Sequence, residues 1–454
     1  MVAPILIRKG LSIRLTGAPA RDVVEAAPVS QISVTPADLK GMKPRLLVQE
    51  GQAVKRGAAI LQDKRHESIF LTAPAAGTVR QVVYGARRAI ERVVIDVAAA
   101  DDAEVFPSFT VEACAAAKAD DVVSLLCRTG LIGLLRQRPF SGIPTPGMTP
   151  KAVFVNAMST APHRADSVTV IKGREKEFQA GLNALKQCAT KGLFLCIAKG
   201  DTALAGFKNA SVQEFDGPHP SGNTSTHIHK LCPIGVGDTV WTITAANLVL
   251  IGELLLTGKV PSHQIVALGG PGVKAGQAKH YRVRIGATVG QITDGRLVDG
   301  ETRIIAGDVL GGTATAPDRL IPFAESAVNV LAEDRERHFL GWIAPGFTLF
   351  SAHRTVASRW LGGASREWSL GTNKNGGDRA MVLTGLYDRF VDLDIMVDYL
   401  VRAVLANDFD EAVKLGLLSV DPEDFALPAF VCPSKMDLVG IVRKGLEDLE
   451  KEGI

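Results

Sequence analysis

Residues 48–79 are the most constraining stretch of this 454-residue chain. Their apolar and β-branched residues come in short alternating runs, and Gly51, Gly57 and Gly77 interrupt these runs where tight turns are expected. The pattern predicts short strands joined by hairpins, and residues 1–100 as a whole read as all-β. The chain is therefore expected to begin with a compact β domain.

The same stretch resembles biotinyl- and lipoyl-carrying domains, which have a barrel-sandwich hybrid fold. It shares with them an E-G-x-x-V-x-x-G hairpin starting at Glu50 and an A-P-x-x-G turn at residues 73–77. His66 occupies the place where those carriers have their modified lysine, and Lys64 is displaced from it by two residues. The resemblance thus implies the carrier fold without a carried cofactor, and the domain is expected to be a docking surface.

Composition is that of an ordinary globular protein, with 46% hydrophobic and 22% charged residues, and the length suits two to four domains. The net charge of +3 alone implies no nucleic-acid partner. Residues 1–97 contain 15 Lys/Arg and 8 Asp/Glu, whereas residues 385–454 contain 7 and 15. This asymmetry suits docking against a macromolecule or an anionic surface, and it equally suits two solvated faces of opposite sign.

Neither a signal peptide nor a membrane span is expected. The longest apolar run, residues 243–257, is interrupted by Glu253 and is shorter than the roughly 20 residues that cross a bilayer. Six cysteines form no C-x-x-C pair, which favours buried thiols in a reduced, cytoplasmic compartment. Cys432 alone cannot hold an iron–sulfur cluster and is expected to be a packed thiol.

Residues 101–262 read as an α/β domain with a helical connector at 111–135. Short buried strands are predicted at 153–158 and 193–198, separated by an amphipathic helix within 173–192. A further helix is predicted at 245–256. Apolar strands alternating with helices favour a parallel, Rossmann-like sheet with a right-handed crossover.

Residues 263–316 read as a compact β-rich domain with recurrent glycine turns, and residues 317–454 as a mixed segment followed by a helical tail. Turns are expected at 341–346 and 371–379. Helices of the tail are expected at 393–406, 409–417 and 436–452.

The glycine cluster at 269–272 follows a predicted strand, as a dinucleotide-binding fingerprint would. Its spacing differs from that fingerprint by one residue, and Pro271 removes an amide that a phosphate would use. A hairpin turn is the better interpretation. No phosphate loop and no G-x-S-x-G motif occurs, so the sequence offers neither a catalytic residue nor a cofactor-binding residue.

Three histidines cluster at residues 215–233: His219, His227 and His229. On a strand, His227 and His229 would point to one face and could bind a metal. The surrounding prolines and glycines favour instead a structured loop, in which such residues cap and hydrogen-bond. The loop is therefore assigned no definite role and no metal.

The segment Arg136-Gln137-Arg138-Pro139-Phe140 combines two cations with an aromatic ring. Arg136, Arg138 and Phe140 could bind a planar, carbonyl-bearing ligand such as a quinone by stacking and charge-assisted hydrogen bonds. The alternative is an exposed basic turn between two domains.

Taken together, these segments resemble the A subunits of the Na+-translocating NADH:quinone oxidoreductases over essentially the whole chain. Thr384 departs from the isoleucine usual in that family. The resemblance is carried by RKGLSIRLTG (8–17), residues 73–77, RQRPFS (136–141), FDGPHPSG (215–222), THIH (226–229), GWIAPG (341–346), NGGDRAM (375–381), FVCPSK (430–435) and EKEG (450–453).

The resemblance implies a multidomain α+β layout: a barrel-sandwich hybrid at 1–100, an α/β domain at 101–262, a β-grasp SLBB-type domain at 263–316, and the helical tail. It also implies a likeness to the architecture of the NADH-binding subunit of complex I. It further implies a peripheral subunit on the cytoplasmic face of the bacterial inner membrane, attached only through partners.

By the same resemblance, the chain belongs to a six-subunit pump that oxidises NADH, reduces ubiquinone and exports Na+. The flavins, the iron–sulfur centre and NADH are expected on other subunits, with a scaffold or quinone-access role for this one. One alternative is a free-standing flavin or NAD dehydrogenase of the complex I type, and another is a pure scaffold that binds nothing small.

Overall fold

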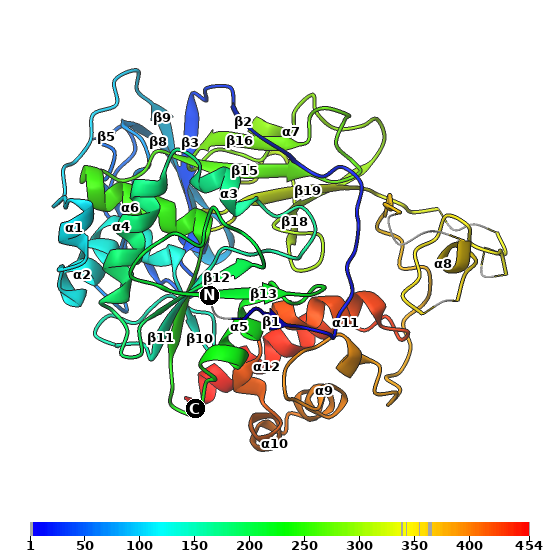
Figure 1. Ribbon diagram of the computed structural model, residues 1–454. Coiled ribbons are helices and arrows are strands. Elements are labelled where there is room, and N and C mark those ends of the chain that lie inside the picture. The colour runs from blue at the N-terminus through cyan, green and yellow to red at the C-terminus, as the bar shows by residue number, and fades with distance from the viewer. Residues whose placement is uncertain (1–2, 337–338, 342, 354, 362–365, 454) are drawn as a thin grey trace.

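The structure is a computed structural model that describes residues 3–336, 339–341, 343–353, 355–361 and 366–453. Within these residues the chain forms two six-stranded sheets, a four-stranded sheet and a three-stranded sheet, followed by a group of helices. Figure 1 shows the blue N-terminal segment running along the body from one six-stranded sheet to the helical tail.

The four- and three-stranded sheets form the N-terminal barrel-sandwich. Their orders are β3-β9-β8-β5 and β4-β6-β7, with bounds β3 (Gln31–Val34), β4 (Pro44–Leu46), β5 (Ala53–Val54), β6 (Ala59–Asp63), β7 (Phe70–Thr72), β8 (Gly77–Tyr84) and β9 (Ile90–Val97). Leu61, Val79, Val93 and Ile95 are fully buried between the sheets. His66 lies in the hairpin between β6 and β7, as the sequence predicted for the carrier position.

A six-stranded sheet organises the α/β domain. Its order is β1-β13-β12-β11-β14-β10, and β10 alone is antiparallel. The predicted parallel sheet is therefore confirmed, with the predicted strands and helices within a few residues of their expected bounds. Its elements are β1 (Ile5–Leu6), α1 (Val111–Cys114), α2 (Ala119–Thr129), β10 (Arg136–Arg138), β11 (Ala152–Asn156), α4 (Glu175–Lys186), β12 (Leu193–Ala198), β13 (Ser211–Asp216), α5 (Thr224–Leu231), β14 (Val240–Thr244) and α6 (Ala245–Thr257).

The second six-stranded sheet has the order β18-β17-β19-β15-β16-β2. The glycine cluster at 269–272 begins the connection between the antiparallel strands β15 and β16, so the hairpin interpretation is confirmed. The elements of this sheet are β2 (Ala20–Glu25), β15 (His263–Gly269), β16 (Lys279–Arg284), α7 (Gly290–Thr293), β17 (Thr302–Ala306), β18 (Thr313–Thr315) and β19 (Ala327–Ala332). The last strand of this sheet along the chain, β19, lies beyond residue 316, where the β-rich domain was expected to end.

Helices beyond residue 384 enclose a core of their own. The largest buried side chains there are Tyr387 and Phe425. The Cys432 Sγ lies 2.9 Å from the Tyr387 hydroxyl, and all six cysteines are buried and free, as predicted. The expected turn at 341–346 includes residue 342, which is outside the described residues. These helices are α9 (Val397–Leu405), α10 (Phe409–Lys414), α11 (Ala426–Val431) and α12 (Leu438–Glu452), and the short helix α8 (Ser358–Leu361) precedes them in the chain.

The strands β1 and β2, the first in the described part of the chain, pair outside the barrel-sandwich. In what we call the strap, residues 3–27, β1 pairs with β13 of the α/β sheet and β2 with β16 of the second sheet. Gly10 has φ +132°, and a Cβ there would overlap the His219 carbonyl oxygen. Glycine therefore allows the strap to cross the 217–222 loop in close contact.

No helix in the described ranges is both long enough and apolar enough to cross a bilayer.

Candidate functional site

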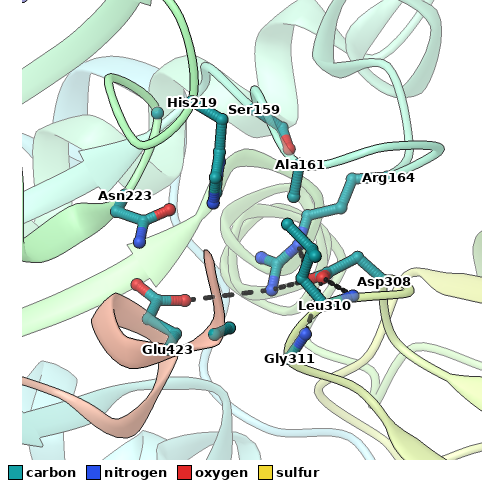
Figure 2. A pocket seen from close by; sticks show the side chains of 11 residues that line it. Ser159, Ala161, Arg164, His219, Asn223, Asp308, Leu310, Gly311 and Glu423 are labelled. Atoms are coloured by element: carbon teal, nitrogen blue, oxygen red, sulfur yellow. Dashed lines mark hydrogen bonds and ion pairs between the residues drawn. The ribbon is translucent and has the colours of Figure 1, made fainter. Parts of the chain in front are cut away.

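A pocket lies where the α/β sheet, the second sheet and the helical tail meet (Figure 2). Two of its walls follow the carboxyl ends of the parallel strands β11 and β13, the edge of such a sheet where ligands usually bind. The other walls come from the loop between β17 and β18 and from the tail. The lining residues are Ser159, Ala161, Arg164, His219, Gly222, Asn223, Asp308, Leu310, Gly311, Glu423 and Ala426.

Arg164 connects the three parts. Its Nε and Nη2 atoms lie 2.9 Å and 2.8 Å from the Asp308 Oδ2 atom, and Nη2 is 3.9 Å from a Glu423 carboxylate oxygen. The second Asp308 oxygen accepts from the backbone N–H groups of Leu310 and Gly311. Burial acts to raise the pKa of Asp308, but Arg164 and these N–H groups hold it below its ordinary value.

His219 points its ring into the pocket (Figure 2), and its Nε2 atom has no hydrogen-bond partner among the described residues although the residue is only 4% exposed. The Nδ1 atom lies 3.1 Å from the Thr160 hydroxyl, which accepts from the Gly222 N–H. Burial lowers the pKa of His219 to about 4, so the ring is neutral at pH 7. The Nε2 atom of the neutral ring can therefore form a hydrogen bond with a polar group in the pocket.

Acidic residues of the tail gather beside the pocket. Burial raises the pKa of Glu423 to about 8, with Arg164 opposing and Asp421 and Asp424 adding to the rise. Burial likewise raises the pKa of Asp424 to about 6. Asn223 donates to Asp424 at 3.2 Å, which joins the α/β domain to the same acidic turn.

The raised pKa of Glu423 predicts that the contribution of this residue to stability falls as pH rises. Glu423 loses its proton near pH 4.5 in the unfolded chain and near pH 8 in the folded one, so the folded state binds the extra proton between these values. From pH 6.5 to 8, the free energy of unfolding of the wild type should fall relative to Glu423→Gln, because the variant has no carboxyl group to protonate at this position. Urea titrations at several pH values measure it. Exposed Glu450→Gln serves as the control, and parallel curves for all three proteins would contradict the prediction.

The histidine cluster is neither a strand nor a single loop. His219 lies in a loop, but His227 and His229 lie on helix α5, because the proline- and glycine-rich run ends at Gly222 and the helix begins after Asn223. Residues two apart on a helix point in different directions, which removes the metal-binding geometry of a strand. His227 is fully buried against Phe215 and donates from Nε2 to the Ser221 carbonyl, whereas His229 is half-buried.

Arg136 and Arg138 lie on strand β10, which pairs with β14, so the alternative of an exposed basic turn is wrong for these two residues. Arg138 is only 2% exposed. It donates to the Ser225 hydroxyl at 2.8 Å, and its Nε atom lies 3.7 Å from an Asp421 carboxylate oxygen. Arg136 is half-buried and donates to the Gly133 and Leu135 carbonyls.

Phe140 is half-buried against the core of the helical tail. It follows β10 and therefore lies between the α/β domain and the tail. The Nε and Nη2 atoms of Arg138 are buried, and neither has a hydrogen-bond partner in the part of the chain that the structure describes. Asp421, the ionic partner of Arg138, is also hydrogen-bonded to Ser141. The candidate quinone-binding residues thus adjoin the acidic turn that borders the pocket.

Sequence reasoning missed Arg164, Asp308 and Glu423. The chain has 99 charged residues, and no local motif distinguishes these three from the others. The proximity of Ser159 to His219 could have been inferred, because both follow parallel strands of one sheet. Among the described residues, no group of three or more His, Cys, Asp or Glu side chains is arranged to hold a metal ion.

Three domain families match the chain in order. They are the NqrA N-terminal barrel-sandwich hybrid domain at residues 5–98, the NqrA second alpha/beta domain at 117–260 and the NQRA C-terminal domain at 265–316. Among solved structures, an NAD+-reducing [NiFe]-hydrogenase is 14% identical in sequence, and the match covers 77% of this chain and 68% of the hydrogenase chain. Its TM-score of 0.36 is too low to indicate a shared fold.

Three whole-length relatives are named as the A subunit of a Na(+)-translocating NADH-quinone reductase. The protein from Serratia proteamaculans is 40% identical over 453 residues, 99% of this chain and 100% of the relative. Those from Neisseria meningitidis serogroup B and Alcanivorax borkumensis are each 38% identical over 452 residues, with the same coverage. The chain therefore belongs to the NqrA family, the A subunits of the Na(+)-translocating NADH-quinone reductases.

Proposed function

We propose that this chain works as a peripheral subunit of a six-subunit sodium pump that oxidises NADH, reduces ubiquinone and exports Na+. It lies at the cytoplasmic face of the bacterial inner membrane and is held there by its partner subunits. NADH, the flavins and the iron–sulfur centre belong to other subunits, and this chain has no catalytic residue. The full-length match to relatives named as the A subunit supports this assignment.

Within the pump, we assign the chain a scaffold role combined with a quinone-access role at Arg136, Arg138 and Phe140. The observation that supports it is the buried Arg138 guanidinium, two nitrogen atoms of which lack a hydrogen-bond partner within the described ranges. Buried N–H groups of a cation are costly when they make no hydrogen bond, and a ligand carbonyl would satisfy one of them. Phe140 offers an aromatic surface two residues further along the chain.

Titration of the purified chain with a short-chain, water-soluble quinone tests this role. Arg138→Lys keeps the charge beside Asp421 but loses the planar fork of N–H donors. It should weaken quinone affinity about tenfold, the effect of losing one charge-assisted hydrogen bond. Arg136→Gln removes the neighbouring charge and should weaken affinity in the same direction. Arg335→Lys, at an exposed ion pair with Glu301, is the control.

Wild-type affinity in both variants would exclude these residues from quinone binding. A wild type that binds no quinone, while still co-purifying with its partners, would leave the scaffold role alone. The free-standing dehydrogenase is tested by the visible absorption spectrum of the purified chain, where flavin or cluster absorbance would favour that alternative.

A further inference from the structure

His219 gives the pocket a hydrogen-bond donor that no described residue uses. Its Nε2 atom is buried, lacks a partner within the described ranges and points into the pocket (Figure 2). The Thr160 hydroxyl accepts from the Gly222 N–H and lies 3.1 Å from Nδ1, so its own proton can point to Nδ1. We therefore assign the proton of the neutral ring to Nε2. A buried N–H group is costly when it makes no hydrogen bond, and a ligand oxygen would satisfy it.

Arg164 supplies further donors to the same space. The Nε and Nη2 atoms of its guanidinium lie against Asp308, and the planar fork has additional N–H groups that can reach another acceptor. Figure 2 shows the end of this guanidinium and the His219 ring on two sides of one space. The Arg164 side chain is 31% exposed, so a molecule can reach the space from solvent. Donors from two loops thus meet at one acceptor position.

Asn223 and Glu423 supply acceptors on the remaining sides. The Asn223 Nδ2 atom donates to Asp424 at 3.2 Å, and the amide oxygen lies on the pocket side in Figure 2. The carboxyl group of Glu423 faces the same space. Burial raises the pKa of Glu423 to about 8, so at pH 7 this group is mostly protonated. A protonated carboxyl group offers both an acceptor oxygen and an O–H donor.

The charges around the pocket favour a neutral ligand. Arg164 and Asp308 form an ion pair, and Glu423 is mostly uncharged at pH 7. An anion would lie close to the carboxylate of Asp308 and to the acidic turn that contains Asp424. A cation would face the guanidinium of Arg164 and the N–H group of His219. The lining therefore suits an uncharged group that has both an acceptor and donors.

We propose that this pocket binds the primary carboxamide group, CO–NH2, of a small neutral molecule. The carboxamide oxygen accepts from His219 and Arg164, and its N–H groups donate to the Asn223 oxygen and to the Glu423 carboxyl group. The pocket is small and opens to solvent beside the exposed Ser159. The compact carboxamide therefore enters it, while the rest of the molecule lies outside.

An NMR titration of the full-length chain with acetamide tests the proposal, because broadening of the acetamide methyl signal reports the bound fraction. The dissociation constant should be on the order of millimolar, as expected for so small a ligand. Acetate and N,N-dimethylacetamide are the matched probes, at constant ionic strength. Both lack the N–H donors, and acetate adds a negative charge, so each should bind at least about tenfold more weakly.

Variants of His219 test the donor. His219→Met removes the N–H group and should weaken acetamide binding about tenfold, whereas His219→Gln returns an N–H donor near the Nε2 position and should retain most of the affinity. The control is His66→Met, at the half-buried histidine in the hairpin between β6 and β7. Thermal unfolding checks that the variants remain folded.

A pH series tests the contribution of Glu423. Affinity for acetamide should fall between pH 7 and pH 9, because Glu423 loses its O–H donor as pH rises through its pKa of about 8. Arg164 and Asp308 face this carboxyl group from other elements, and Asp421 and Asp424 face it from its own turn. Glu423→Gln has a neutral amide there and should bind equally at both pH values, which isolates Glu423 from these neighbours.

Three results would each overturn the proposal. They are a wild type that does not bind acetamide, a matched probe that binds as tightly as acetamide, and a His219→Met variant that binds as the His66→Met control does. The same fall in affinity with pH in the wild type and in Glu423→Gln would contradict the pairing with Glu423. The proposal goes beyond the proposed function, since Arg136, Arg138 and Phe140 take no part in this site.

Discussion

Replacing Arg164 by methionine is expected to lower the free energy of unfolding by about 3–5 kcal/mol, as the loss of one partner of a buried ion pair does. The Asp308 side chain is only 4% exposed and would remain as an unpaired buried carboxylate. Glu423 would lose its nearest cation as well. Because Arg164 holds three parts of the chain together, the effect should appear as a lower midpoint in urea-induced unfolding.

Two comparisons make this result specific. Arg335→Met removes an ion pair with Glu301 whose side chains are both more than half exposed, so it should lower stability by about 1 kcal/mol or less. Arg164→Met/Asp308→Asn removes both charges and should recover part of the loss, since the new amide would still offer an oxygen to the Leu310 and Gly311 N–H groups. Equal effects at Arg164 and Arg335 would show that the buried pair is not stabilising.

Replacing Gly10 by alanine is expected to destabilise the protein by about 3 kcal/mol or more, combining backbone strain with overpacking. Gly10 has φ +132°, and the added methyl group would collide with the His219 carbonyl. The same carbonyl accepts a hydrogen bond from the Leu11 N–H at 2.8 Å. The variant should therefore displace His219 from its pocket as well as lower the unfolding midpoint.

Gly276→Ala separates these two contributions. Gly276 also has a positive φ, +76°, but a Cβ there would meet no atom within 4 Å. Its cost should be only the backbone strain, about 1–2 kcal/mol. An NMR titration of the His219 ring should change in Gly10→Ala and stay unchanged in Gly276→Ala. Similar stability losses in the two variants would mean that the collision with the His219 carbonyl adds no cost to Gly10→Ala.

Local sequence patterns were sufficient to predict the strands and helices whose apolar residues recur with a regular period. The buried strand β12 and the helices α4 and α6 agree with their predicted positions, because an apolar period reports which face an element buries. Strand β10 was missed because Arg138 resembles a surface residue. Its burial depends on Ser225 and Asp421, which are distant in sequence.

The pocket could be predicted only in part. The sequence singles out three histidines in the stretch 215–233, but of these three only His219 lines the pocket, because α5 places His227 in the core. Arg164, Asp308 and Glu423 give no local signal, since their function as an ion-pair cluster arises only when the two six-stranded sheets and the tail meet. Such clusters are determined by tertiary packing, which periodicity does not report.

The strand pairs of the strap also determine when β1 and β2 can pair during protein synthesis. β1 leaves the ribosome first, but its partner β13 ends at Asp216, so the N-terminal strand waits until about two hundred more residues have been translated. At roughly 5–20 residues per second, that delay is on the order of 10–40 seconds. β2 waits longer still, for β16 at residues 279–284. During this interval the nascent chain exposes unpaired strand edges, which are prone to aggregation.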